Sequence, residues 1–197
     1  MRAHAVSWLV IVGILVFFLA GLGVAIKKSV FGILVDSRNK MSLSQFQVTL
    51  WTVVLTSSVF AVALANRTMN IGLDQTLWAL LGISIGSASG AVLIKGQKNS
   101  LLLTASKPNW RDMFRGEEKP DFEYVDIGKV QMFLFTLAVL LGYGWELWFW
   151  NIVPTQDGRI QFPVITGELV TFLGISHAGY LTIKAAPKPA PKTAPTP

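Results

Sequence analysis

His177 is the one imidazole inside a long apolar segment of this 197-residue chain. An ionisable side chain at membrane depth is by default a functional candidate, because an imidazole can carry protons or bind a metal. A zinc site, however, takes three or four protein ligands, and no second His or carboxylate shares the register of His177. We therefore expect a neutral imidazole that hydrogen-bonds a Ser or Thr of a neighbouring helix, with no metal and no other cofactor.

Glu146 is the second ionisable candidate, one turn from the end of an apolar segment and close to Trp145 and Trp148. It is placed to reach the membrane interface or to pair with Arg159. The sequence contains no glycine-rich phosphate loop, no His-Glu-x-x-His zinc motif, no Gly-x-Ser-x-Gly elbow and no cysteine. We therefore expect a protein that is not an enzyme, and a transporter or membrane enzyme centred on His177 and Glu146 stays as an alternative.

Small residues recur at every fourth position in two of the apolar segments. They are Gly82, Gly86 and Gly90 in one segment and Gly174, Ala178 and Thr182 in the other. Small side chains let two helices approach closely, which favours association in lipid. This spacing predicts that the two segments form the central helix contact. The alternatives are an interface between subunits and a narrow pore lined by Ser84, Ser87 and Ser176.

The chain also contains an internal sequence repeat. A shift of 84 residues aligns Gly32 with Gly116, Ser42 with Asp126 and Gln47 with Gln131, and a shift of 92 aligns 81–84 with 173–176. The two shifts predict a duplicated helical hairpin, with a longer loop in the second copy. Ser42 and Asp126 are good N-cap residues. The paired glutamines either bond head groups and neighbouring helices, or face each other on the bundle axis and fix how the halves meet.

Five apolar segments are long enough to cross a bilayer, which takes about 20 residues. They are 8–26, 48–65, 77–94, 130–150 and 164–183. Charged residues make up only 14% of the chain, against roughly 25% in an average soluble domain. The predicted fold is all-α: a polytopic membrane bundle over residues 1–184, with five transmembrane helices.

The bundle divides into a lead helix (1–30), a first hairpin (31–95), a loop (96–129) and a second hairpin (130–184) of the same topology. A Pro-rich tail, 185–197, is expected to be disordered. The lead helix can also be interpreted as a cleaved signal peptide, since Arg2 precedes an apolar core and small residues follow it. We take it as retained, because cleavage would invert the charge pattern of the later loops.

The basic residues set the expected orientation. Fourteen of the 17 Lys and Arg residues fall in 27–47, in 95–129 or after residue 183, and only Arg2, Arg67 and Arg159 fall on the other side. The positive-inside rule then places the N-terminus outside and the C-terminus in the cytoplasm, in a plasma membrane such as the bacterial inner membrane. The same rule accounts for the net charge of +6 without nucleic acid as a partner. Trp8, Trp78, Trp145 and Trp148 fall near expected outer ends and Trp51 near an inner end, as interfacial tryptophans do.

The 96–129 loop contains one amphipathic element. Asn109 offers a cap, and Trp110, Arg111, Phe114 and Arg115 follow at helical spacing before Gly116. This pattern predicts a short helix in the head-group layer, with its cations toward anionic lipid. The segment 117–121 after it is expected to be solvated and turn-like.

The sequence is rich in residues that pack helices and poor in residues that react. We expect a non-enzymatic scaffold, accessory or assembly subunit that associates with itself or with a membrane-protein partner in the lipid bilayer. An oligomeric channel or small-solute pore is the first alternative, and the transporter or enzyme centred on His177 and Glu146 is the second.

Overall fold

A computed structural model describes residues 2–69, 71, 75–98, 104–119, 121–149, 162 and 165–187, and these residues contain helices and no strand. The α-helices are α1 (Arg2–Lys27), α2 (Leu43–Asn66), α3 (Gln75–Gln97), α4 (Ile127–Trp148) and α5 (Gly167–Ala185). The 3₁₀ helices are η1 (Gly32–Leu34) and η3 (Trp110–Met113). The expected all-α fold is confirmed, and each of the five apolar segments corresponds to one long helix.

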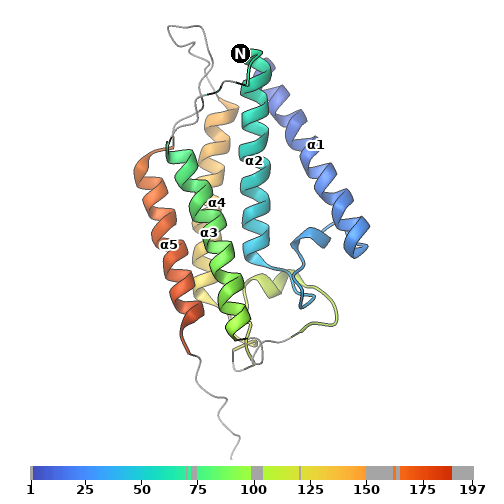
Figure 1. Ribbon diagram of the computed structural model, residues 1–197, viewed down its shortest axis with the longest axis vertical. Helices are drawn as coiled ribbons and strands as arrows, with labels where there is room; N and C mark the ends of the chain where they lie inside the picture. Colours follow the sequence, from blue (N-terminus) through green and yellow to red (C-terminus); the bar gives the residue numbers. More distant parts are fainter. Residues whose placement is uncertain are drawn as a thin grey trace, which may run out of the picture.

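Four of the helices, α1 to α4, are long and apolar enough to cross a membrane. α5 has 19 residues and lies against α3 and α4 (Figure 1). α2 and α4 both begin at one end of the bundle, and α3 and α5 return to that end (Figure 1). The chain thus has the composition and helix lengths of a membrane protein.

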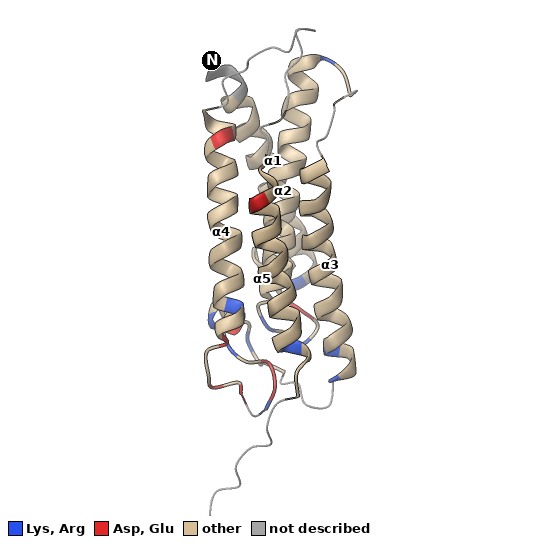
Figure 2. Cartoon of the chain, turned by 90° about the vertical axis from the view of Figure 1, so that its left-hand side faces the viewer, with Lys and Arg blue, Asp and Glu red and all other residues tan. Residues whose placement is uncertain are grey.

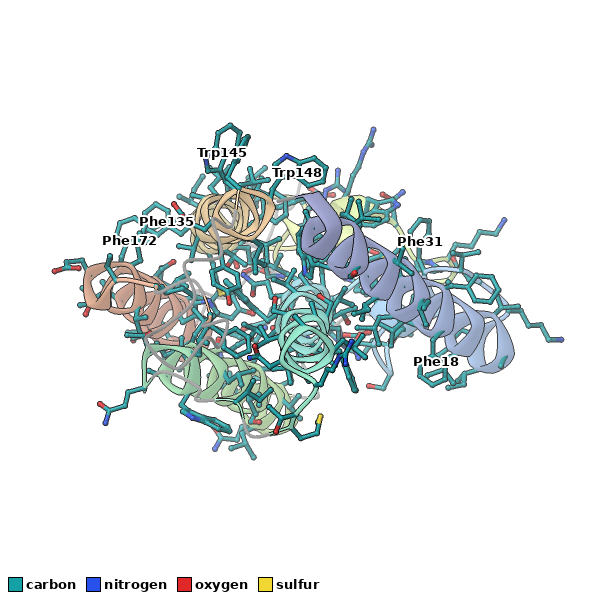
Figure 3. All side chains as sticks on the ribbon, turned by 90° about the horizontal axis from the view of Figure 1, so that it is seen from above. Phe18, Phe31, Phe135, Trp145, Trp148 and Phe172 are labelled. Carbon is teal, nitrogen blue, oxygen red and sulfur yellow. The ribbon has the colours of Figure 1, made fainter. Side chains whose placement is uncertain are left out.

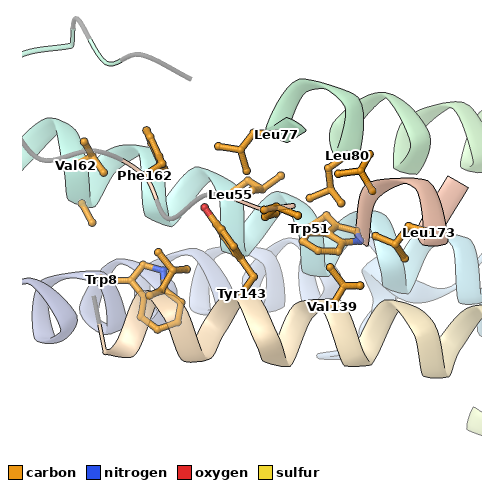
Figure 4. Close-up of a cluster of buried hydrophobic side chains, with 14 residues drawn as sticks. Trp8, Trp51, Leu55, Val62, Leu77, Leu80, Val139, Tyr143, Phe162 and Leu173 are labelled. Carbon is orange, nitrogen blue, oxygen red and sulfur yellow. The ribbon is translucent and has the colours of Figure 1, made fainter. Parts of the chain in front are cut away.

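α2 is the central helix of the bundle. It contacts α1, α3 and α4, and α5 completes the arrangement on the far side of α3 and α4 (Figure 3). The core around it contains Trp51, Leu80 and Leu173 (Figure 4), together with Leu147, and each of the four is only 1% exposed. Phe18, Trp145 and Trp148 point away from the bundle instead (Figure 3), as expected for side chains that meet lipid or head groups.

Two tryptophans differ from the expected interfacial placement. Trp8 is buried, and its indole Nε1–H donates to the Ser57 hydroxyl over 2.9 Å. Trp51 is part of the core between the helices (Figure 4). An indole has a large apolar surface as well as its N–H, so burial inside a bundle suits it when a partner or tight packing is present. Trp78, Trp145 and Trp148 are exposed, as expected.

α1 is the least buried helix. It lies close to α2 near Trp8 and diverges from it toward the other end (Figure 1). Most of its apolar side chains are exposed, Phe17 by 82%. At its far end the chain folds back sharply, so that a Cβ atom on Gly23 would lie 2.8 Å from the Ser29 carbonyl oxygen. Glycine at this position therefore permits the turn that leads into η1.

The two hairpins start with the same local structure. In each, a 3₁₀ helix is followed by an antiparallel bridge, Val35 with Met41 and Arg115 with Val125. The N-cap N–H then donates over 2.8 Å to the residue before the bridge, Ser42 to Leu34 and Asp126 to Phe114. Both predicted N-caps are confirmed, since the Ser42 and Asp126 side chains accept from the backbone N–H three residues on.

The structural correspondence between the two hairpins differs at some positions from the alignment that the sequence suggests. Met41 corresponds to Val125 at the shift of 84, but their bridge partners Val35 and Arg115 are 80 residues apart. The turn between the bridged residues is therefore four residues longer in the second hairpin. Gly32 lies in η1 whereas Gly116 follows its bridge, so these two glycines are not equivalent.

Candidate functional site at the charged end of the bundle

Most Lys and Arg residues gather where α2 and α4 begin and α3 and α5 end (Figure 2). We call this part the charged end; it comprises residues 27–46, 95–98, 104–130 and 183–187. Acidic side chains also occur near the opposite end, on α4 and α5 (Figure 2). The charged end contains every ion pair of the described residues.

Glu117 is the centre of these ion pairs. Its carboxylate lies 2.7 Å from Lys184 Nζ, 3.0 Å from Arg38 Nη2, 3.1 Å from Lys129 Nζ and 3.5 Å from Lys95 Nζ. The four cations come from α5, the turn before α2, α4 and α3 in that order. One loop carboxylate thus connects four separate parts of the bundle, and it is only 14% exposed.

Asp36 is a second carboxylate in the same cluster. It lies 2.7 Å from Arg38 Nη2 and 3.5 Å from Lys95 Nζ. Burial acts to raise the pKa of Asp36, but Arg38 and Lys95 outweigh it and hold the pKa below its usual value. In the same way, burial opposes the ionised form of Glu117, and the surrounding cations still hold its pKa well below the usual range. Both groups are therefore carboxylates at neutral pH.

Glu118 is a third carboxylate of the charged end, and it lies near the C-terminus of α5. Glu118 pairs with Lys98 Nζ over 2.9 Å, and Lys98 also donates to the carbonyl oxygens of Lys184 and Ala186. The last carbonyls of a helix have no partner within the helix. Lys98 therefore caps the end of α5 while Glu118 neutralises its charge.

The part of the cluster around Lys129 and Lys184 is packed too tightly to be a substrate site. The cavity beside Lys95, Glu117, Lys129 and Lys184 has a volume of about 20 Å³. That is room for one water molecule. Lys129 Nζ also donates over 2.7 Å to the Arg115 carbonyl oxygen. The arrangement ties the loops to the helix ends and leaves no room for a reactant beside Lys129 and Lys184.

The expectation that residues 117–121 form a solvated turn was wrong for Glu117 and Glu118. The ends of α3, α4 and α5 each bring a lysine to one place, and buried cations need counter-charges. Glu117 and Glu118 supply them from the loop. The signal in the sequence was a pair of adjacent carboxylates in a loop between apolar segments that are flanked by lysines.

η3 differs from the predicted head-group helix. Asn109 is the cap as expected, but only Trp110–Met113 follow, as one 3₁₀ turn. Met113 is buried, Phe114 meets the Phe133 ring at 5.1 Å and Trp110 meets the Phe31 ring at 5.0 Å. The apolar side chains thus pack on the bundle itself. Three of the four predicted membrane-surface residues, Trp110, Arg111 and Arg115, are nevertheless exposed.

The paired glutamines do not face each other. Gln47 is buried, and its Nε2 donates to the Thr136 hydroxyl at 2.6 Å and to the Met132 carbonyl at 3.3 Å. Gln131 is exposed. Gln47 therefore bonds a neighbouring helix, the first of the two interpretations, and it joins the hairpins through α4 residues one and five places after Gln131.

The small residues form only part of the predicted contact. α3 and α5 do lie together, and Gly90 and Gly174 face Leu181 and Ile83 across the contact. Gly82 and Gly86, in contrast, are exposed, and a Cβ atom on either would meet nothing within 4 Å. On α5 the same holds for two predicted residues, since Ala178 and Thr182 are exposed. The buried residues of α3 are Leu77, Leu80, Ser84, Ser87 and Ala91.

Ser84, Ser176 and His177 are buried inside the bundle. Neither the two serine hydroxyls nor the His177 ring nitrogens have a hydrogen-bond partner within the described residues. The expected bond from His177 to a Ser or Thr is therefore not formed there. No group of three or more His, Asp and Glu residues able to hold a metal occurs in the described part of the chain.

Glu146 is exposed near the opposite end of α4, and its expected partner Arg159 lies outside the described residues. Gly128 faces Ile183 across α4 and α5, which sets the register of the two helices. In that register Glu146 lies 12 residues beyond the level of His177, roughly 18 Å along the axis at 1.5 Å per residue. The two side chains do not form one site.

Comparison of the chain with protein-family models, with curated proteins and with solved structures found no match.

Proposed function

We propose that this protein is a non-enzymatic membrane scaffold or assembly subunit that associates through the outer face of α3. The supporting observation is the open space beside Gly82 and Gly86. Ser89, on the same face, is exposed as well. In lipid, where burial of apolar surface does not drive association, small residues of this spacing let another helix approach closely.

The proposal includes five membrane crossings, with α5 as the fifth, and the charged end in the cytoplasm. Its support is the position of α5 beside α3 and α4 together with the concentration of Lys and Arg at one end (Figure 2). The matching bridges and N-caps of the two hairpins support an origin by duplication. A bacterial inner membrane suits this orientation.

The experiment fills the open space beside Gly82 and Gly86 with larger side chains. A Cβ atom at Gly82 or Gly86 would meet no atom of a neighbouring helix within 4 Å, so we expect the folded monomer to tolerate Gly82→Leu and Gly86→Leu. Gly142→Leu on α4 is the matched control, because a Cβ atom there also meets nothing within 4 Å. Association is measured by light scattering in mild detergent and by energy transfer between labelled copies in liposomes.

We expect the two α3 variants to lose association with a second copy or with a copurified membrane protein, and Gly142→Leu to retain it. A wild-type protein that is strictly monomeric and copurifies with nothing would refute the scaffold proposal. So would α3 variants that associate as well as the control.

The alternative of a pore is tested separately. Ser84 and Ser176 are buried in the bundle, so a pore lined by them would have to open between α3 and α5. Solute flux into liposomes that carry the protein, abolished by Ser84→Leu, would favour the pore over the scaffold.

A further inference from the structure

A cavity of about 790 Å³ opens at the charged end between α1, α2, α3 and the turn after η1. It exists because α1 diverges from α2 toward this end (Figure 1). Its volume lies in the range of about 300–1,000 Å³ typical of ligand pockets. Unlike the tight space beside Lys129, it has room for a molecule.

The cavity combines two chemistries. Asp36, Arg38 and Lys95 line its polar side, and Leu19, Val48 and Val92 line its apolar side. Val92 is 67% exposed on the outer surface of α3, so the apolar side continues onto the surface that faces lipid in our proposal. A ligand that fills both sides must have a polar head and an apolar tail.

The polar side has bonding capacity that the protein leaves unused. Arg38 is 11% exposed, and its Nε and Nη2 bind Asp36 and Glu117. Its Nη1 is buried and has no hydrogen-bond partner within the described residues. A buried donor without an acceptor costs about 1–3 kcal/mol or more when charged. Other atoms of Arg38 line the cavity, so its guanidinium lies beside the cavity as a cation.

Lys95 also has spare capacity. Its Nζ is 3.5 Å from both Asp36 and Glu117, longer than the roughly 2.7–2.9 Å of a charge-assisted hydrogen bond. The charged residues that line the cavity are two cations, Arg38 and Lys95, and one carboxylate, Asp36, so the lining has one formal positive charge in excess. The head group that completes this site is therefore an anion with several acceptor oxygens.

We propose that the cavity binds one anionic glycerophospholipid, with its phosphate on Arg38 and Lys95 and the upper part of its acyl chains against Leu19, Val48 and Val92. A phosphate diester supplies the acceptors and the negative charge, and the acyl chains account for the apolar wall. The site is distinct from the α3 face proposed for association, and either can exist without the other.

The first variant blocks the cavity and leaves every ion-paired residue unchanged. Ala88 lines the cavity, so Ala88→Phe fills part of its volume. Ala79→Phe makes the same change at an exposed position of α3 outside the cavity. Lys95→Gln removes one proposed phosphate contact. Delipidated protein in a neutral detergent is titrated with short-chain phosphatidylglycerol or phosphatidylcholine, and bound lipid is counted by native mass spectrometry.

We expect wild type and Ala79→Phe to bind one phosphatidylglycerol at least tenfold more tightly than phosphatidylcholine. Ala88→Phe and Lys95→Gln should weaken phosphatidylglycerol binding at least tenfold. Equal affinities for the two lipids would overturn the proposal, as would binding unchanged by Ala88→Phe. Displacement by soluble glycerol phosphate at the same concentration as the lipid would also overturn it, because the ligand would then be a soluble anion.

Discussion

Replacement of Glu117 by Gln should be the most destabilising single change at the charged end. Four cations lie within 3.5 Å of this carboxylate, and Gln keeps its size and one acceptor oxygen but removes its charge. Removal of one partner from a buried ion pair costs about 3–5 kcal/mol, because the remaining charge stays buried without compensation. Glu117 is 14% exposed, so solvent screening reduces this cost little, and we expect Glu117→Gln to cost about 3–5 kcal/mol.

The assay is equilibrium unfolding in detergent micelles, followed by the fluorescence of the seven tryptophans. Glu123→Gln is the matched control, because Glu123 is an exposed carboxylate of the same loop, and such surface changes stay within about 0.5 kcal/mol. A second variant, Glu117→Gln with Lys184→Met, removes one of the stranded cations and should recover at least about 1 kcal/mol. Equal stabilities of Glu117→Gln and Glu123→Gln would refute the view that Glu117 holds the helix ends together.

The same carboxylates predict how stability depends on pH. The pKa values of Asp36 and Glu117 are held below their usual ranges, so the unfolded chain binds protons at these groups more readily than the folded one. Their contribution is complete above the unfolded-state pKa of about 4 and is lost as the pH falls through the lower folded-state pKa. We expect the free energy of unfolding to fall below about pH 4, and to fall less steeply in Glu117→Gln. An identical acid limb in both proteins would contradict this.

Three further substitutions test individual contacts by the same unfolding assay. Gln47→Leu removes the buried hydrogen bonds to α4 and should lower the free energy of unfolding by about 1–3 kcal/mol. Gln131→Leu, at an exposed position, should lower it by less than about 0.5 kcal/mol. Equal losses would contradict the finding that only Gln47 joins the hairpins. Asp126→Ala removes the N-cap of α4 and should cost about 0.5–2 kcal/mol, and no loss would show the cap to be unimportant. Trp8→Phe removes the bond to Ser57 and should cost more than about 1 kcal/mol, unless α1 contributes nothing to the fold.

The parts of this fold that the sequence predicted are the ones governed by local rules. Helix positions follow from apolar length, and Ser42 and Asp126 could be recognised as caps because a cap needs only its own side chain and the next N–H groups. The position of α2 at the centre was not predictable in this way. Gln47 and Gln131 are aligned in sequence, yet only Gln47 is buried, because the two hairpins surround α2 unequally.

The direction in which Gly82 and Gly86 face could not be predicted from the sequence either. Their spacing predicts a surface for close helix contact, and it says nothing about whether the contact lies within the chain or outside it. Likewise, Glu117 is a loop residue whose importance depends on four cations from distant segments, the nearest of them, Lys129, 12 positions away in the sequence. No local pattern encodes such a convergence, so it became visible only once the helix ends were placed.

At the charged end, the ion-pair cluster and the open cavity share three side chains. Arg38, Lys95 and Asp36 belong to the tight ion-pair cluster and also line the open cavity. An anion in the cavity would compete with Asp36 and Glu117 for Arg38 and Lys95. Repulsion among the cations increases when Gln replaces Glu117, and an anion beside Arg38 and Lys95 would offset part of that repulsion. The loss of stability in Glu117→Gln should therefore be smaller in anionic lipid than in neutral lipid, and an equal loss in both would separate the two sites energetically.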